Sequence, residues 1–115
     1  MKAISITVDG TISDVEMTDF KSFQTAVGGY VEVLQMTPEV HAFIDEEGKM
    51  KGKAINSMAT MLCRKLDIGL MPGDTINGDM ILVGTGPENE AIDIPDNFIA
   101  KNELLEYVLK AVGRI

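Results

Sequence analysis

The sequence is poor in the residues that build disulfide, metal and cofactor sites. Cys63 is the single cysteine, so no disulfide forms within the chain, and neither a zinc cluster of several thiolates nor a Cys-x-x-Cys redox pair is available. His41 is the single histidine, so the chain offers no second nitrogen ligand for a metal. We therefore expect a protein of a reducing compartment that holds no metal and no cofactor.

Long apolar runs are absent as well. No apolar stretch approaches the roughly 20 residues that a helix needs to cross a bilayer. The N-terminus begins with a strand pattern, not with the basic and hydrophobic regions of a signal peptide. These absences predict a soluble, cytoplasmic protein that does not bind membranes.

Basic residues are few relative to acidic ones. Ten Lys and Arg residues against eighteen Asp and Glu residues give a net charge of -8 at pH 7. Such a surplus repels phosphate backbones and anionic membranes, so we expect no non-specific binding to nucleic acid. Half of the basic residues nevertheless fall in one middle segment: Lys49, Lys51, Lys53, Arg64 and Lys65. A local anion site and a solvated hairpin end with a charged helix face both fit this clustering.

Length and composition predict a single domain over residues 1–115. A chain of 115 residues lies within the usual size of one domain and is too short for two ordinary ones. The hydrophobic share of 45% and the charged share of 24% are typical of a globular protein and not of a disordered or fibrous one. No internal repeat, low-complexity tract or linker is visible.

Two hairpin signals organise the first half of the chain. Residues 2–8 alternate in polarity up to Asp9-Gly10, the commonest hairpin turn chemistry, and residues 11–16 supply the returning strand. The β-forming runs 30–34 and 40–44 predict a second hairpin before the acidic turn 45–48. The apolar run Met80 to Val83 predicts a later strand, and Ile92 and Ile94 predict a short edge strand that ends at Pro95.

The first helix is predicted between the two hairpins. Thr18 is its expected N-cap, and Phe20, Phe23 and Val27 recur at spacings of three and four, which places them on one face. We expect both aromatic rings to pack on the sheet and the helix to end at Gly28.

Two further helices follow. Asn56 or Ser57 is the expected N-cap of the second, which carries an apolar stripe of methionine and leucine and is predicted to stop at Gly69. Asp96 or Asn97 is predicted to start the third. Because hairpin signals outnumber strand–helix–strand alternation, we predict an α+β fold, with a mainly antiparallel sheet built from hairpins and two or three packed helices.

No catalytic signature stands out. His41 lies in a predicted strand and is expected to face solvent, and a hydrolase that uses His41 with Cys63 is the least favoured function. Gly84-Thr85-Gly86 lacks the third glycine and the following helix of a dinucleotide-binding turn. The acidic residues 45–47 lack the alternating spacing of a calcium loop, so an ordinary charged turn is the preferred interpretation. We predict no catalytic residue and no enzyme.

A combination of short patterns in residues 1–100 resembles a known family. The patterns are Gly28-Gly29-Tyr30-Val31-Glu32-Val33, Asp45-Glu46-Glu47-Gly48-Lys49 with Lys51-Gly52, Asn56, Ala59-Thr60, Gly73-Asp74, Gly78-Asp79 and Leu82-Val83-Gly84. Together they resemble a family of small domains of unknown function found in bacteriophages and mobile elements, although Asp45 stands where an asparagine is usual. The resemblance implies a phage or mobile-element setting, a compact α+β fold and no known enzymatic activity.

For function, the clustered basic residues favour a non-enzymatic protein that sequesters a small anionic ligand, such as a nucleotide signal. Backbone N–H groups at a helix N-terminus and basic side chains hold phosphate, and aromatic rings stack on a base. The predicted ligand-binding residues are Lys51, Lys53, Asn56, Ser57, Arg64, Tyr30 and Phe43. We also expect a homo-oligomer.

The acidic balance supports an alternative from another class. An acidic interaction module or DNA mimic blocks a host protein by occupying its nucleic-acid-binding site. Carboxylates spaced like phosphates over one face favour that function, but here they are distributed along the chain without a long run. Both a small anionic ligand and a host protein therefore remain candidate partners.

Overall fold

The predicted strands and helices form close to their expected positions. The computed structural model describes residues 1–96 and residue 98. In chain order the elements are β1 Lys2–Ile6, β2 Ile12–Glu16, α1 Phe20–Val27, β3 Val31–Thr37, β4 Val40–Asp45, α2 Ser57–Lys65, β5 Met80–Thr85 and β6 Ala91–Ile92. The α+β fold, with an antiparallel sheet and two helices among the described residues, is therefore confirmed. Apart from residues 96 and 98, the helix predicted to start at Asp96 or Asn97 lies outside the described residues.

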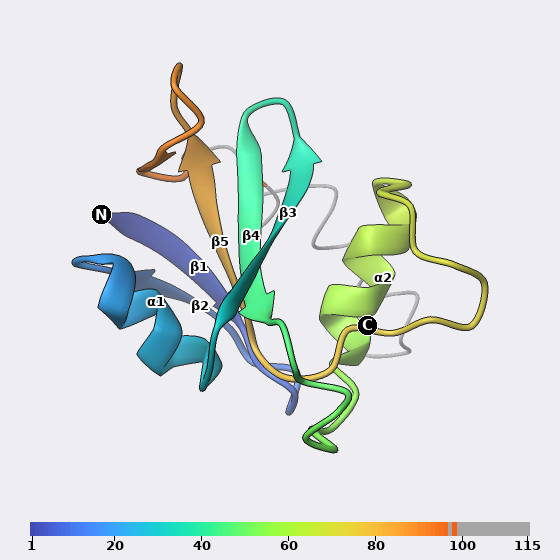
Figure 1. Cartoon of the computed structure of the whole chain (residues 1–115). Coiled ribbons are helices and arrows are strands. Elements are labelled where there is room, and N and C mark those ends of the chain that lie inside the picture. Colours follow the sequence, from blue (N-terminus) through green and yellow to red (C-terminus); the bar gives the residue numbers. More distant parts are fainter. Residues whose placement is uncertain (97, 99–115) are drawn as a thin grey trace.

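Strand β5 joins the two predicted hairpins into one sheet (Figure 1). The strand order is β2-β1-β5-β4-β3, with β6 paired to the end of β5, and all these pairings are antiparallel. Residues 80–84 of β5 are buried throughout. A strand covered on both faces is apolar on both sides, which explains the continuous apolar run. Strands β2 and β3 are left at the edges of the sheet.

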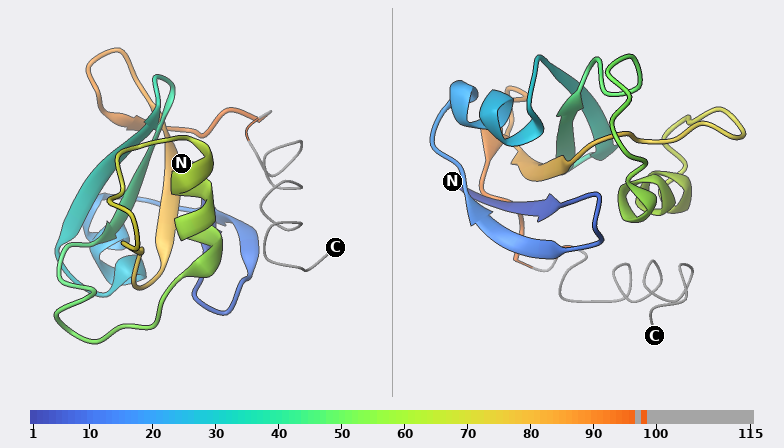
Figure 2. Two further views of the ribbon diagram at one scale, coloured as in Figure 1. Left: turned by 90° about the vertical axis from the view of Figure 1, so that its right-hand side faces the viewer. Right: turned by 90° about the horizontal axis from the view of Figure 1, so that it is seen from below.

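One helix covers each face of the sheet, as Figures 1 and 2 show. Successive side chains of a strand point to opposite faces, so each central strand contributes to two apolar clusters. The cluster under α2 includes Ile4, Ile6, Ala42, Leu82, Met58, Leu62 and Cys63. The cluster under α1 includes Phe23, Val27, Phe43, Ile81 and Val83. The two helices therefore build two separate cores on one sheet.

Helix α1 begins at a different cap from the predicted one. Asp19, not Thr18, is the N-cap, because its carboxylate accepts the Ser22 N–H at 2.9 Å and the Ser22 hydroxyl accepts the Asp19 N–H at 3.2 Å. This reciprocal pair of hydrogen bonds is a capping box, and it satisfies the N–H groups of Asp19 and Ser22 at the start of the helix. The helix ends at Gly28, whose φ of 82° is left-handed, as predicted.

Only one of the two helix phenylalanines packs on the sheet. The Phe23 side chain is buried, and its ring centroid lies 4.4 Å from that of Phe43. Phe20, the first residue of α1, is 60% exposed and does not belong to the apolar cluster. The prediction that both rings pack was therefore wrong for Phe20, which lies at the end of the helix, nearly one turn before Phe23.

Helix α2 carries the predicted apolar stripe but stops earlier than expected. Its last helical residue is Lys65, and the chain leaves the helix through Leu66 and Asp67. Asp67 has a φ of 53°, a left-handed conformation that aspartate tolerates better than most residues. Gly69, the predicted stop, lies beyond this point, with a φ of 87°.

Candidate functional site

Both predicted ligand-binding lysines are paired with a carboxylate. The Nζ atoms of Lys51 and Lys53 lie 3.0 and 2.6 Å from Oδ2 of Asp45 at the end of β4. The same ammonium groups donate to carbonyls at the end of α1, Lys51 to Gly28 O at 3.2 Å and Lys53 to Val27 O at 2.6 Å. The two lysines thus neutralise both a buried carboxylate and the negative end of the helix dipole.

Asp45 is not an ordinary residue of a solvated turn. Its side chain has a relative exposure of 0%. Burial alone raises the pKa of the Asp45 carboxyl, but hydrogen bonds from Lys53, from the Glu47 N–H and from Lys51 outweigh burial and lower the pKa to about 2. The interpretation of residues 45–48 as a plain charged turn is therefore wrong for Asp45, because the lysines that follow the turn fold back onto it.

Asn56 has a structural role. It is fully buried at the N-cap of α2, where its Oδ1 accepts the Ala59 N–H at 3.0 Å. Its Nδ2 donates to Ile6 O at 2.8 Å and to Gly78 O at 2.9 Å. Both polar atoms of the amide are thereby engaged, and the Asn56 backbone N–H donates to Ile76 O at 2.7 Å, so these groups of Asn56 are already used within the fold. Ser57, the first residue of α2, is exposed beside it.

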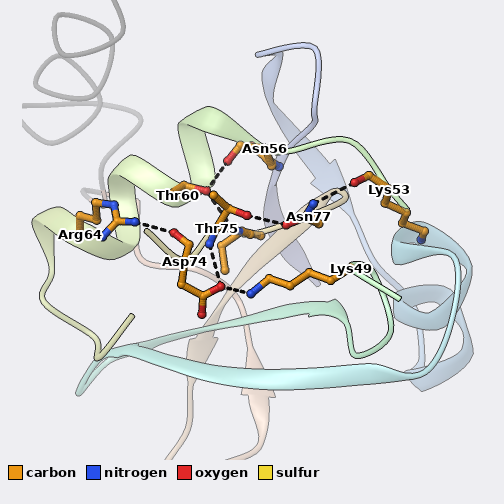
Figure 3. Close-up of polar contacts among 9 residues, drawn as sticks. Lys49, Lys53, Asn56, Thr60, Arg64, Asp74, Thr75 and Asn77 are labelled. Carbon is orange, nitrogen blue, oxygen red and sulfur yellow. Dashed lines mark hydrogen bonds and ion pairs between the residues drawn. The ribbon is translucent and has the colours of Figure 1, made fainter. Parts of the chain in front are cut away.

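Arg64 and Lys49 meet at Asp74 in a second polar group (Figure 3). Lys49 Nζ pairs with the Asp74 carboxylate, and the Arg64 guanidinium donates to Asp74 O. Thr75 connects this pair to Asn77, because its N–H donates to the Asp74 carboxylate and its hydroxyl donates to Asn77 Oδ1. The Asn77 side chain in turn donates to Lys53 O at 2.9 Å. These contacts join residues 74–77, before β5, to α2 and to the segment that contains Lys49 and Lys53. Arg64 is thus engaged with Asp74, away from the ammonium groups that contact Asp45.

The two predicted aromatic ligands differ sharply in exposure. Phe43 is 6% exposed and packs between Phe23 and His41, with ring centroids 4.4 and 5.3 Å away. Its ring is covered in this structure, so it offers no open face on which a base could stack. Tyr30, which immediately precedes β3, is 69% exposed. Among the predicted aromatic residues, Tyr30 is thus the one with a free ring face.

An open cavity of about 380 Å³ lies beside Tyr30 at the end of α1. It is lined by Lys21, Gln24, Thr25, Gly28, Gly29, Tyr30, Glu47 and Lys51. The cavity brings together Tyr30 and Lys51 of the predicted set. The other predicted residues, Lys53, Asn56, Ser57, Arg64 and Phe43, do not line it.

Sequence reasoning missed the contribution of α1 to this cavity. Its lining residues Gln24, Thr25 and Gly28 follow Lys21 by three, four and seven residues, which is the spacing of one helix face. This polar face was available as a signal in the sequence. Lys21 is exposed and forms no ion pair with a carboxylate in the part of the chain that the structure describes.

His41 and Cys63 do not form a catalytic pair. His41 is 3% exposed, its Nδ1 lies 2.6 Å from Thr85 Oγ1, and burial lowers its pKa. Its ring contacts Phe43 on the α1 side of the sheet, whereas Cys63 packs on the α2 side. Burial also raises the pKa of the Cys63 thiol to about 12, which leaves it protonated and unreactive. The prediction that His41 faces solvent was wrong because β4 is covered on both faces.

Other kinds of site find no support in the described part of the chain. Within residues 1–96 and 98, no group of three or more His, Cys, Asp or Glu side chains is placed to hold a metal ion. No helix among these residues has the length and apolarity needed to span a bilayer. The cavity beside Tyr30, which joins an exposed aromatic ring with two lysines, is the candidate site.

Two glycines of the family-like pattern stand where a side chain has no room. A Cβ at Gly29 would lie 2.4 Å from Lys51 Nζ and 2.8 Å from Asp45 Oδ1. A Cβ at Gly48 would lie 2.2 Å from Asn77 O. The Gly-Gly-Tyr pattern and the acidic turn thus meet around Asp45, at the wall of the cavity.

Comparison with known proteins identifies a family. No match was found among curated proteins or among solved structures. The profile of a family described as a domain of unknown function, DUF3846, matches residues 1–108 of the 115 residues. The chain therefore belongs to the DUF3846 family.

Proposed function

We propose that this protein is a non-enzymatic binding protein that captures a small anionic ligand, such as a nucleotide, in the cavity beside Tyr30. The observation that carries the proposal is the convergence of an exposed aromatic ring with the side chains of Lys21 and Lys51 around one cavity of about 380 Å³. Cavities of about 300–1,000 Å³ are typical of small-molecule sites in proteins.

Four side chains at the cavity suit parts of a nucleotide. The ammonium groups of Lys21 and Lys51 donate charge-assisted hydrogen bonds to phosphate. The Tyr30 ring offers a face on which a base stacks. The Glu47 carboxylate accepts hydrogen bonds from the ribose hydroxyls. This set replaces the larger one expected from the sequence, and it keeps Tyr30 and Lys51.

Lys51 is able to bind phosphate because Lys53 holds Asp45 more closely. Lys53 lies 2.6 Å from the Asp45 carboxylate, against 3.0 Å for Lys51, and the Lys51 side chain is the more exposed, at 38% against 27%. When Lys51 turns to a ligand, Asp45 keeps one cation and its hydrogen bond from the Glu47 N–H at 2.9 Å. The buried charge therefore stays neutralised in the bound state.

The setting of the protein is part of the same proposal. The sequence pattern resembles domains of phages and mobile elements, and we propose that the protein is an accessory factor that sequesters a nucleotide signal in the host cytoplasm. The favoured mechanism is capture without turnover, since no group of the cavity is a nucleophile paired with a base.

Native mass spectrometry tests the capture directly. The protein is measured as purified from cells, and again after addition of a mixture of nucleoside mono-, di- and triphosphates and cyclic nucleotides. We expect a discrete added mass that corresponds to one ligand class. A protein whose mass is unchanged by every nucleotide in the mixture contradicts the proposal.

A further inference from the structure

Strand β3 leaves one edge of the sheet open. It is the last strand in the sheet order, and no strand among residues 1–96 and 98 pairs with its outer edge (Figures 1 and 2). Val33 on this strand is 54% exposed. A register shift between Gln35 and Thr37 limits the regular part of the edge to residues 31–35. The N–H and C=O groups of an edge strand form a template for another extended chain.

A groove runs beside this edge on the α2 side. Its volume is about 220 Å³, and it shares no lining residue with the cavity beside Tyr30. Its apolar lining comes from Leu34, Ile44 and Leu70. Its carboxylates come from Glu32 on β3, from Glu46 after β4, and from Asp45 and Asp74, and Lys49 is its one basic lining residue. The groove thus combines an apolar surface with negative charge.

Two of these carboxylates lack a cation. Asp45 is neutralised by the lysines described above, and Asp74 by Lys49. Glu32 and Glu46 are exposed and form no ion pair in the part of the chain that the structure describes. The carboxylates of Glu32 and Glu46 are therefore open to a cationic group of a partner.

We propose that the β3 edge is a docking site for an extended, positively charged segment of a partner protein. The segment pairs with the backbone of β3 as an added strand. Because alternate side chains of a strand point to one face, an Arg or Lys of the segment enters the groove. Its methylene groups contact Leu34 and Leu70, and its charged end pairs with Glu32 and Glu46.

A second copy of this chain fits the edge less well. Each copy would bring its own Glu32 and Glu46 to the shared edge, and each carries a net charge of -8. Like charges placed close together across an interface oppose association. Charge therefore favours a cationic partner over self-pairing.

Fluorescence anisotropy with synthetic peptides tests the proposal. The probe is a labelled peptide of alternating valine and arginine, compared with its glutamate analogue and with a version N-methylated at alternate residues, which cannot pair as a strand. We expect binding of the arginine peptide alone. The double variant Glu32→Gln/Glu46→Gln weakens this binding by about tenfold or more, since charged pairs across an interface carry this much affinity.

The double variant Asp14→Asn/Glu88→Gln is the matched control. It removes two exposed carboxylates elsewhere on the chain, so we expect unchanged affinity apart from a small effect of net charge. Amide hydrogen exchange of the complex adds a positional readout, with new protection expected at residues 31–35. Equal weakening by both double variants, equal binding of the N-methylated peptide, or a dimer formed through β3 overturns the proposal.

Discussion

At the scale of single residues, Lys51 and Lys53 look equivalent in the sequence but differ in the structure. Both contact Asp45 and the end of α1, yet Lys53 makes the shorter contacts and is the less exposed of the two. We infer a division of roles, in which Lys53 stabilises the fold and Lys51 serves the ligand cavity.

Replacement of each lysine measures this division. We expect Lys53→Ala to lower the free energy of unfolding by about 1–3 kcal/mol, since it removes the closest donor to a buried carboxylate. Lys51→Ala should cost less than about 1 kcal/mol, as is usual for a partly exposed ion pair. Urea denaturation of both variants checks the order, with Lys2→Ala as a control for the lost charge. Equal losses for Lys51→Ala and Lys53→Ala would refute the division.

At the scale of elements, Asn56 links three parts of the chain. Its side chain caps α2 and also holds the backbone at the end of β1 and at Gly78, just before β5. Asn56→Ala leaves two buried carbonyls and one helix N–H without their partner. We expect a loss of about 2–5 kcal/mol, the combined cost of a lost cap and of unsatisfied buried acceptors.

The neighbouring Ser57 supplies the control for this prediction. It is exposed at the start of the same helix, so Ser57→Ala should change the free energy of unfolding by less than about 0.5 kcal/mol. Thermal or urea unfolding of the two variants is the measurement. If Ser57→Ala lowered the free energy of unfolding as much as Asn56→Ala does, the buried amide of Asn56 would not be the cause of the loss.

Local elements were predictable because their signals are local. Asp9-Gly10 turns the first hairpin, and the glycine at position 28 ends α1, since each conformation depends on a few adjacent residues. The central place of β5 was not predictable, because it depends on pairings with β1 and β4, which are distant in sequence. The N-cap of α1 was placed one residue too early because Thr18 and Asp19 are adjacent and both are good capping residues.

Two of the residues named from the sequence, Tyr30 and Lys51, line the candidate cavity, and side-chain direction explains why others lie elsewhere. Phe43 was misplaced because only the register of β4 decides which face its ring takes. Asp45 was misjudged because its burial depends on lysines that return to it after the turn.

At the scale of the whole molecule, the cavity and the groove both lie near the start of β3 and the end of β4. Helix α1 completes the cavity, whereas residues 70–77 complete the groove. The cavity beside Tyr30 is lined by two lysines and Glu47, whereas the groove beside β3 is lined by four carboxylates and Lys49. We propose that these lysines let a protein with a net charge of -8 hold a small anion locally. Self-association, which we expect from the sequence, stays a prediction.

Calorimetric titration of the cavity variants tests the central claim most directly. The titrant is the nucleotide that gives an added mass in native mass spectrometry, and the proteins are the unchanged chain, Lys21→Ala, Tyr30→Ala and the control Lys2→Ala. We predict that Lys21→Ala and Tyr30→Ala each weaken binding by about tenfold or more, as expected for the loss of a charged hydrogen bond or a stacking face, while Lys2→Ala leaves it unchanged. Affinity that is the same in all four proteins would contradict a ligand site beside Tyr30.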